Sequence, residues 1–135
     1  MPAANLNYCP DVAAVLVTHN PNLQSLRAAV QAVAGQVSQL VVIDNASANF
    51  APDWLQELDS QFDAGLHLLP QADNLGIGAG HNIGIQWAQK HGAAFVLLLD
   101  QDSQVQADMV SRLRLAYTDL TRSKVAVAGL GPRYR

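Results

Sequence analysis

An unbroken apolar run at residues 95–99 ends in two carboxylates one residue apart, and this feature constrains the fold most strongly. The run is too short to span a membrane and predicts a strand buried on both faces. Asp100 and Asp102 stand at its carboxyl end, where open α/β sheets hold their ligands. The chain is therefore expected to form an α/β domain with a site at this edge.

The acidic pair has two explanations. In an extended chain Asp100 and Asp102 point the same way, with Cα atoms about 7 Å apart. Two such carboxylates favour a divalent cation with oxygen ligands, such as magnesium, manganese or calcium. The alternative is helix capping, because Ser103 and Gln106 form the pattern S-x-x-Q of a capping box.

The rest of the chain alternates short apolar runs with stretches of helical periodicity. Strands are expected at residues 12–18, 40–43, 66–69, 95–99 and 125–130, with amphipathic helices between them. This alternation predicts a three-layer α/β/α sandwich with a mostly parallel sheet. At 135 residues the chain suits one domain over 1–135, with residues 1–11 as a leader.

Local signals predict where the helices begin and end. Asn20 is expected to cap a helix that has Pro21 at its first position, and Gly35 to end it. Pro52 is expected to open the second helix, and Gly92 to follow the third.

Three polar clusters follow the expected strands, at residues 18–20, 44–45 and 100–102. Each alone is compatible with turn or cap chemistry. Right-handed crossovers would bring the ends of the first, second and fourth strands to one edge of the sheet. Their shared location favours a ligand site.

Composition excludes several classes of protein. The chain is half hydrophobic and only 14% charged, which argues against disorder. A formal net charge of -3 without a Lys/Arg cluster argues against a general nucleic-acid or anionic-lipid surface. Cys9 is the single cysteine, which excludes an intrachain disulfide and fits a reducing compartment. The four histidines have no zinc-ligand spacing and are interpreted as surface or packing residues.

A glycine-rich segment, N-L-G-I-G-A-G-H-N-I-G, occupies residues 74–84 and leads into a helix. Glycines cost up to about 1 kcal/mol each in a helix, so they predict close approach of the backbone to a ligand or a neighbouring element. A dinucleotide-binding domain is a weak alternative. Its fingerprint G-x-G-x-x-G follows the first strand, whereas this segment follows the third and places His81 or Ile83 at the last glycine position.

A haloacid-dehalogenase-like phosphatase is the second alternative, because it also uses an apolar strand ending in D-x-D. There the first Asp is a nucleophile and the second an acid/base. That motif lies on the first strand and has Thr or Val two residues after the second Asp. In this chain the motif comes late in the sequence, and Gln104 stands at that position.

Four motifs together resemble the inverting family 2 glycosyltransferases of GT-A fold, in their rhamnosyltransferase-like branch. They are V-T-H-N-P at 17–21, V-I-D-N-A-S at 42–47, the glycine-rich segment at 74–84, and L-L-D-Q-D-S at 98–103. The motifs occur in the family's order across nearly the whole chain. The resemblance implies a GT-A domain that binds a nucleotide-diphosphate sugar, with dTDP-rhamnose as the first donor to consider.

The resemblance also implies roles for individual residues. By this resemblance, residues 18–20 and Asp44 border the nucleobase and ribose, and residues 74–82 line the donor pocket beside them. The D-x-D holds Mg²⁺ or Mn²⁺ and the diphosphate, with Asp102 in direct metal contact and Asp100 at the ribose or metal. The expected donor-binding residues are Thr18, His19, Asn20, Asp44, Asn74, Gly76, Gly78, Asn82, Asp100 and Gln101, and the expected metal ligands are Asp100 and Asp102.

The sequence departs from the family pattern at two points. His19 stands where the family often has Tyr or Phe for base stacking. Family members also continue into an acceptor-binding half that supplies the carboxylate base, so the catalytic base is expected beyond Arg135. The nearer carboxylates, Asp108 and Asp119, are expected to be solvated helix residues. The chain is therefore expected to be the donor-binding part, inactive alone or a non-catalytic nucleotide-binding or scaffold fragment.

The resemblance extends to partners and location. It implies an acceptor that is a cell-surface polysaccharide or a lipid-linked glycan, and a cytoplasmic protein working at the inner face of the membrane. A sheet lacking its acceptor half is expected to expose an apolar edge and to self-associate.

Overall fold

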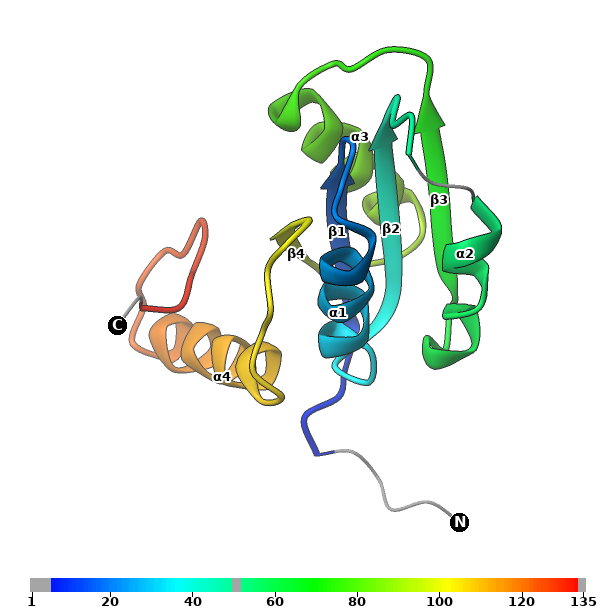
Figure 1. Ribbon diagram of the computed structural model, residues 1–135. Helices are drawn as coiled ribbons and strands as arrows, with labels where there is room; N and C mark the ends of the chain where they lie inside the picture. Colours follow the sequence, from blue (N-terminus) through cyan, green and yellow to red (C-terminus); the bar gives the residue numbers. More distant parts are fainter. Residues whose placement is uncertain (1–5, 50–51, 134–135) are drawn as a thin grey trace.

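A computed structural model describes residues 6–49 and 52–133 of the chain. Its centre is one parallel sheet in the order β3-β2-β1-β4 (Figure 1). The strands are β1 (Cys9–Thr18), β2 (Val37–Asn45), β3 (Leu66–Gln71) and β4 (Phe95–Asp100). The neighbours pair in parallel throughout. The predicted α/β class and parallel sheet are thereby confirmed.

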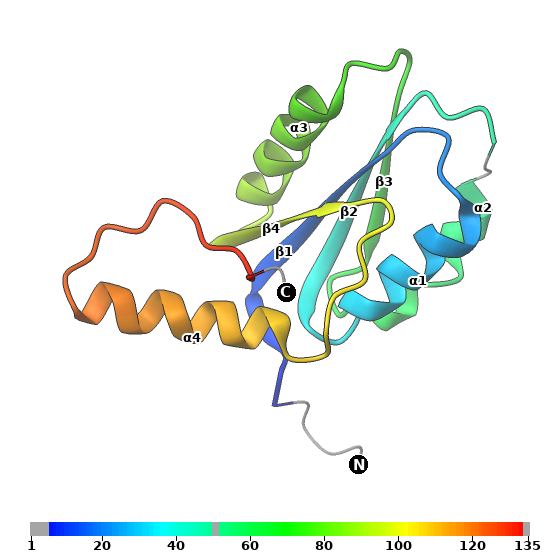
Figure 2. The ribbon, with the colours of Figure 1, turned by 60° about the vertical axis from the view of Figure 1, so that its left-hand side comes forward.

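Helices cover both faces of this sheet, which confirms the predicted three layers. One face carries α1 (Leu23–Val33), α2 (Pro52–Gln56) and α4 (Met109–Arg122), and the other carries α3 (Ile77–Lys90). Figure 2 shows α3 on the opposite side of the sheet from α1 and α4. No helix in the described part of the chain is long and apolar enough to cross a membrane.

The core is divided by the alternation of side chains along the strands. Leu16 and Val42 face α1, where they pack with Val30, while Val15 and Val41 face α3. Val15, Leu16, Val41 and Val42 are completely buried. β1 and β2 therefore read as continuous apolar runs because each is covered on both faces.

The glycines of α3 permit close packing on the sheet. A Cβ at Gly80 would lie 2.8 Å from Val17 Cγ1, and one at Gly84 would lie 2.2 Å from Val15 Cγ1. Neither distance is sterically possible, so these two glycines are explained by the close approach of α3 to β1 and not by a ligand. Gly76 and Gly78 have nothing within 4 Å of such a Cβ and face open space.

Two strand predictions were wrong. β4 is an edge strand, with Leu98 47% exposed, and is not buried on both faces. An apolar run shows that a strand forms but does not show how many neighbours it has. Residues 125–130 form no strand. They run past α4 as irregular chain, and Val125 and Leu130 are 46% and 41% exposed.

Several boundary predictions also need correction. β1 begins at Cys9, inside the expected leader. The cap of α1 is Asn22, whose side chain accepts from Ser25 N at 2.9 Å, and not Asn20. The Ser103 capping box does not form, because α4 begins only at Met109. The helix ends were predicted correctly at Gly35 and Gly92, which take the positive φ values of 81° and 85°.

Candidate functional site

The carboxyl ends of three strands meet at one edge of the sheet, as predicted. Thr18 is in register with Asp44, and Val17 with Asp100. From β1 the chain crosses by α1 to β2, whereas it reaches β4 from β3 by α3 on the opposite face. The strand order therefore reverses between β1 and β4, which is the place where open α/β sheets bind ligands.

Asp44 organises the end of β2. It is 8% exposed, and its Oδ1 accepts hydrogen bonds from Thr18 Oγ1 at 2.9 Å and from the Ser47 hydroxyl. Its Oδ2 accepts from Ser47 N at 3.2 Å. Three hydrogen bonds engage most of the acceptor positions of a carboxylate, so Asp44 holds the loop and retains little capacity for a ligand.

His19 and Asn20 connect the ends of three strands. The His19 N–H donates to Gln101 Oε1 at 2.9 Å, across the gap between β1 and β4. His19 Nδ1 lies 2.6 Å from the Asn45 carbonyl, and because a carbonyl only accepts, Nδ1 carries the proton. Asn20, at φ 44°, accepts from Ala48 N at 2.8 Å. These bonds make the loops after β1 and β2 one unit.

Asp100 and Asp102 are both exposed at the end of β4, where a cation has access to them. Among the described residues no group of three or more His, Cys, Asp or Glu side chains is placed to hold a metal ion. Magnesium is commonly held by only one or two carboxylates together with substrate phosphates and water. The donor set therefore fits a metal that arrives with a diphosphate, and does not fit a metal held by protein alone.

The first turn of α3 lies at the same edge. Gly76, at φ 86°, precedes the helix, and its N–H donates to Asn74 Oδ1 at 3.0 Å. Gly76, Gly78 and Asn82 are exposed. A helix N-terminus with little side-chain cover offers backbone N–H groups to an anion.

Two polar groups that sequence reasoning missed lie beside this turn. Asn45 is 2% exposed; its Nδ2 donates to the Gly76 carbonyl at 3.0 Å, while its Oδ1 has no hydrogen-bond partner among the described residues. His81 Nε2 is likewise buried and without a partner there. A buried polar atom of this kind costs about 1–3 kcal/mol when unsatisfied, so each atom calls for an explanation. Only the folded geometry shows that these atoms are buried without partners.

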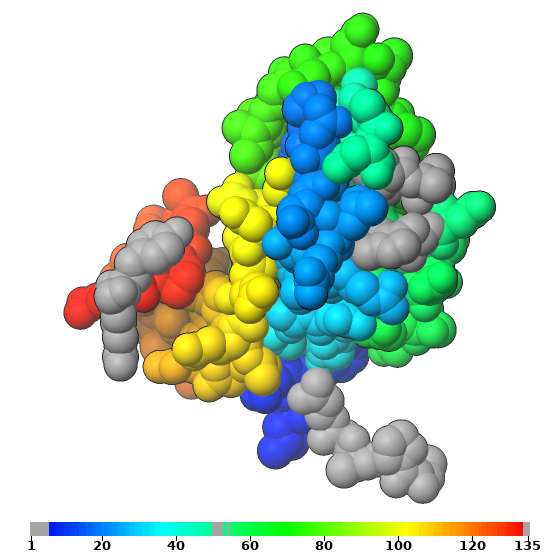
Figure 3. Space-filling view, viewed as in Figure 1, coloured from blue at the N-terminus to red at the C-terminus, as the bar shows by residue number. Residues whose placement is uncertain are grey.

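The segment after β4 lies along α1, as Figure 3 shows. Gln36, 2% exposed in the connection between α1 and β2, donates from Nε2 to the Gln106 carbonyl at 2.9 Å and accepts from Val110 N at 3.1 Å. Gln36 therefore caps α4 from a distant part of the chain and anchors the far end of the acidic loop, residues 101–108 between β4 and α4.

Shifted pKa values occur at the opposite end of β1. Burial, with Asp63 as hydrogen-bond partner, raises the pKa of Tyr8 to about 12. Burial also raises the pKa of the Cys9 thiol. The hydrogen bond from Arg114 to Asp11, 2.8 Å long, raises the pKa of that guanidinium. This ion pair joins α4 to β1 of the sheet.

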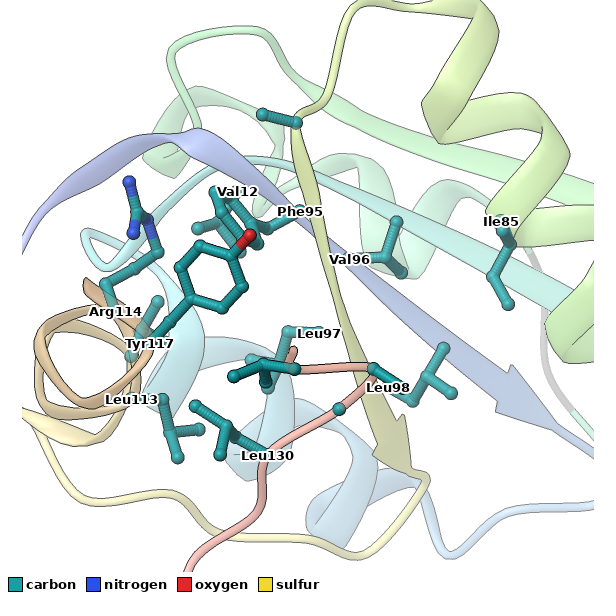
Figure 4. Close-up of a pocket in the computed structure, with 15 residues that line it drawn as sticks. Val12, Ile85, Phe95, Val96, Leu97, Leu98, Leu113, Arg114, Tyr117 and Leu130 are labelled. Carbon is teal, nitrogen blue, oxygen red and sulfur yellow. The ribbon is translucent and has the colours of Figure 1, made fainter. Parts of the chain in front are cut away.

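A cavity of about 440 Å³ lies between β4 and α4, away from the polar edge (Figure 4). Apolar side chains line most of it, among them Phe95, Leu97, Leu113 and Leu130. The Arg114 guanidinium lies 4.2 Å from the centre of the Phe95 ring. Its lining lacks the polar groups of the edge, so the candidate site is the open edge and not this cavity.

The parallel sheet and the helices on its two faces form the GT-A type of fold, as comparison with solved structures shows. TarS 1-349 from S. aureus in complex with UDP matches with a TM-score of 0.66 and 17% identity, over 91% of this chain and 38% of that chain. TarS 1-349 in complex with UDP-GlcNAc matches with a TM-score of 0.62 and 17% identity, over 91% of this chain and 37% of that chain.

Residues 13–129 match glycosyl transferase family 2, and the chain belongs to that family. It is also 31% identical over 116 residues to the dTDP-rhamnosyl transferase RfbF of Shigella flexneri. That alignment covers 86% of this chain and 37% of the relative, so the chain spans little more than a third of the relative's length. Family membership removes the phosphatase and dinucleotide-binding alternatives.

Proposed function

We propose that this chain is the donor-binding part of a family 2 glycosyltransferase. Its ligand is a nucleotide-diphosphate sugar, with dTDP-rhamnose as the first candidate because a relative at 31% identity is a dTDP-rhamnosyl transferase. The observation that carries the proposal is the arrangement at the carboxyl edge. There the exposed Asp100 and Asp102 stand beside the loops of β1 and β2 at the reversal of the strand order.

In this proposal Asp100 and Asp102 hold Mg²⁺ or Mn²⁺ against the diphosphate. When bound, such an ion would act as a Lewis acid that offsets the charge of the departing diphosphate. The two carboxylates fix the place of the ion, and the first turn of α3 offers N–H groups to the phosphate oxygens. Before binding, the exposed carboxylates and the diphosphate repel each other, so affinity should depend on the metal.

The nucleobase and ribose would lie between the loops that follow β1 and β2. Thr18, His19 and Asn20 form one side, and Asp44 keeps them in place through Thr18 Oγ1. Asn45 Oδ1 is a buried acceptor without a hydrogen-bond partner among the described residues, and we propose that it accepts a hydrogen bond from an N–H of the base. His81 Nε2 would form a second polar contact on the side of α3.

The acceptor and the base that activates it belong to the whole protein. The family resemblance suggests a cell-surface polysaccharide or lipid-linked glycan, extended at the inner face of the membrane. Inverting attack needs a carboxylate to deprotonate the acceptor hydroxyl. We place that carboxylate in the acceptor-binding half, and we expect little or no sugar transfer by this chain alone.

Calorimetry tests the proposal with dTDP and UDP, each titrated in Mn²⁺ and in EDTA. We expect binding in Mn²⁺ that is at least tenfold weaker in EDTA, and tighter binding of dTDP than of UDP if rhamnose is the sugar. Binding of neither nucleotide in Mn²⁺ would contradict the proposal and favour a scaffold fragment. Equal nucleotide affinities in EDTA and in Mn²⁺ would contradict the proposed role of the metal.

A further inference from the structure

The acidic loop begins as a tight turn whose two central residues have different environments. Ser103 N donates to the Asp100 carbonyl at 3.1 Å, which closes a turn over Asp100, Gln101, Asp102 and Ser103. Asp100 and Asp102 are exposed, whereas Gln101 is partly buried. The side chain of Gln101 turns back onto the protein and accepts from the His19 N–H at 2.9 Å.

This hydrogen bond crosses the gap between two strand ends. His19 directly follows β1, and Gln101 directly follows β4, so the bond continues the pairing of these strands beyond Val17 and Asp100. The acceptor is a side-chain oxygen and the donor is a backbone N–H. The contact therefore depends on the residue type at 101 and not at 19.

The other end of the acidic loop is held separately. Gln36 binds the Gln106 carbonyl at 2.9 Å and the Val110 N–H at 3.1 Å. Residues 102–105 lie between these two attachments. Without Gln101, the near end of the stretch that carries Asp102 would keep only its connection to β4 and the hydrogen bond from Ser103 N to the Asp100 carbonyl.

We propose that Gln101 is a positioning residue, which holds Asp100 and Asp102 in the geometry that receives the metal and diphosphate; this inference rests on the proposed function. A carboxylate on a free turn must be ordered when its ligand binds, and that ordering weakens binding. The bond to the His19 N–H orders the turn beforehand. Gln101 thus acts through its two acidic neighbours and not as a donor contact, which revises its expected role.

The test compares Gln101→Leu with Gln104→Leu. Gln104 is an exposed glutamine of the same loop and has no hydrogen bond to another described residue, so it is a matched control. Affinity for dTDP or UDP is measured by calorimetry in Mn²⁺ and in EDTA. We expect Gln101→Leu to weaken binding in Mn²⁺ about fivefold to tenfold, because the freed turn must then be ordered when the ligand binds. Binding in EDTA should not change, and the melting temperature should fall by no more than the few degrees expected for one exposed hydrogen bond.

The outcomes separate positioning from direct contact. An equal loss in Mn²⁺ and in EDTA would overturn the inference, because a direct donor contact would be lost in both. An effect no larger than that of Gln104→Leu would also overturn it.

A second measurement needs no ligand. Amide ¹⁵N relaxation should show increased picosecond to nanosecond motion at Asp102 in Gln101→Leu, with no increase in Gln104→Leu. Unchanged motion at Asp102 would overturn the inference whatever the nucleotide binding shows. If the native chain binds no nucleotide but Asp102 becomes mobile in the variant, the positioning stands and the proposed function fails.

Discussion

Asp44 and Asn45 are adjacent, yet they have opposite tasks at the end of β2. Asp44 accepts three hydrogen bonds within the protein, whereas Asn45 Oδ1 accepts none among the described residues. The pattern D-N-A-S placed both at the edge of the sheet, but it could not show which of them has a spare acceptor. That difference arises because successive side chains of a strand point to opposite faces.

Asn45→Ala tests the proposed acceptor. The change removes one satisfied group, Nδ2, and one unsatisfied group, Oδ1, so the free energy of unfolding should change by less than about 1 kcal/mol. Nucleotide affinity in Mn²⁺ should fall about tenfold, or 1.4 kcal/mol, because the N–H of the base loses its partner. Urea unfolding and calorimetry measure the two effects.

Asn49→Ala is the control for Asn45. The side chain of Asn49 also donates to a backbone carbonyl, that of Pro21, at 2.6 Å, but it leaves no buried acceptor unsatisfied among the described residues. We expect about 1 kcal/mol of lost stability and unchanged affinity. An Asn45 variant that behaves like this control would argue against the acceptor role.

At the scale of elements, the glycines of α3 set the distance between this helix and the sheet. Gly84→Ala would place a Cβ 2.2 Å from the completely buried Val15. Overpacking of this kind costs typically about 1–3 kcal/mol, against a gain of up to about 1 kcal/mol in helix propensity. We expect a net loss of about 1–2 kcal/mol in urea unfolding. Gly78→Ala, in open space on the same helix, should be neutral or stabilising, and equal effects would refute the packing role.

The helices and strands were easier to predict from the sequence than their tertiary contacts and their positions in the sheet. Strand cores and helix faces follow from local periodicity, so β1 to β4 and the four helices were found. The cap of α4 could not be found this way, because Gln36 accepts from Val110 N across 74 positions of the chain. Likewise, β1 and β4 are both apolar runs, and only the sheet order shows that one is central and the other an edge.

The place of the candidate site in the fold was predictable to a similar degree. The three polar clusters met at one edge, because the carboxyl ends of parallel strands must do so. Which side chains in that edge are occupied by the protein depends on tertiary hydrogen bonds. Gln101 and Asp44 bind within the protein, whereas Asn45 and His81 present unsatisfied atoms, and no spacing in the sequence distinguishes these cases.

For the whole molecule, the outer edge of β4, which pairs with no further strand among the described residues, predicts self-association. Leu98 and Leu130 are 47% and 41% exposed, and the strand carries no proline or lysine to protect its edge. We expect light scattering coupled to size exclusion to show a mass that rises with concentration. Leu98→Lys should reduce that rise, and a concentration-independent monomer would contradict the expectation.

The acidic pair gives the most direct test of the central claim, that Asp100 and Asp102 hold a metal with the donor diphosphate. The measurement is calorimetry of dTDP in Mn²⁺ with Asp102→Ala, and with Asp119→Ala as an exposed aspartate on α4 for comparison. We predict that Asp102→Ala reduces affinity at least tenfold, to the value that the native chain has in EDTA, while Asp119→Ala changes nothing. Native affinity in Asp102→Ala would contradict the claim.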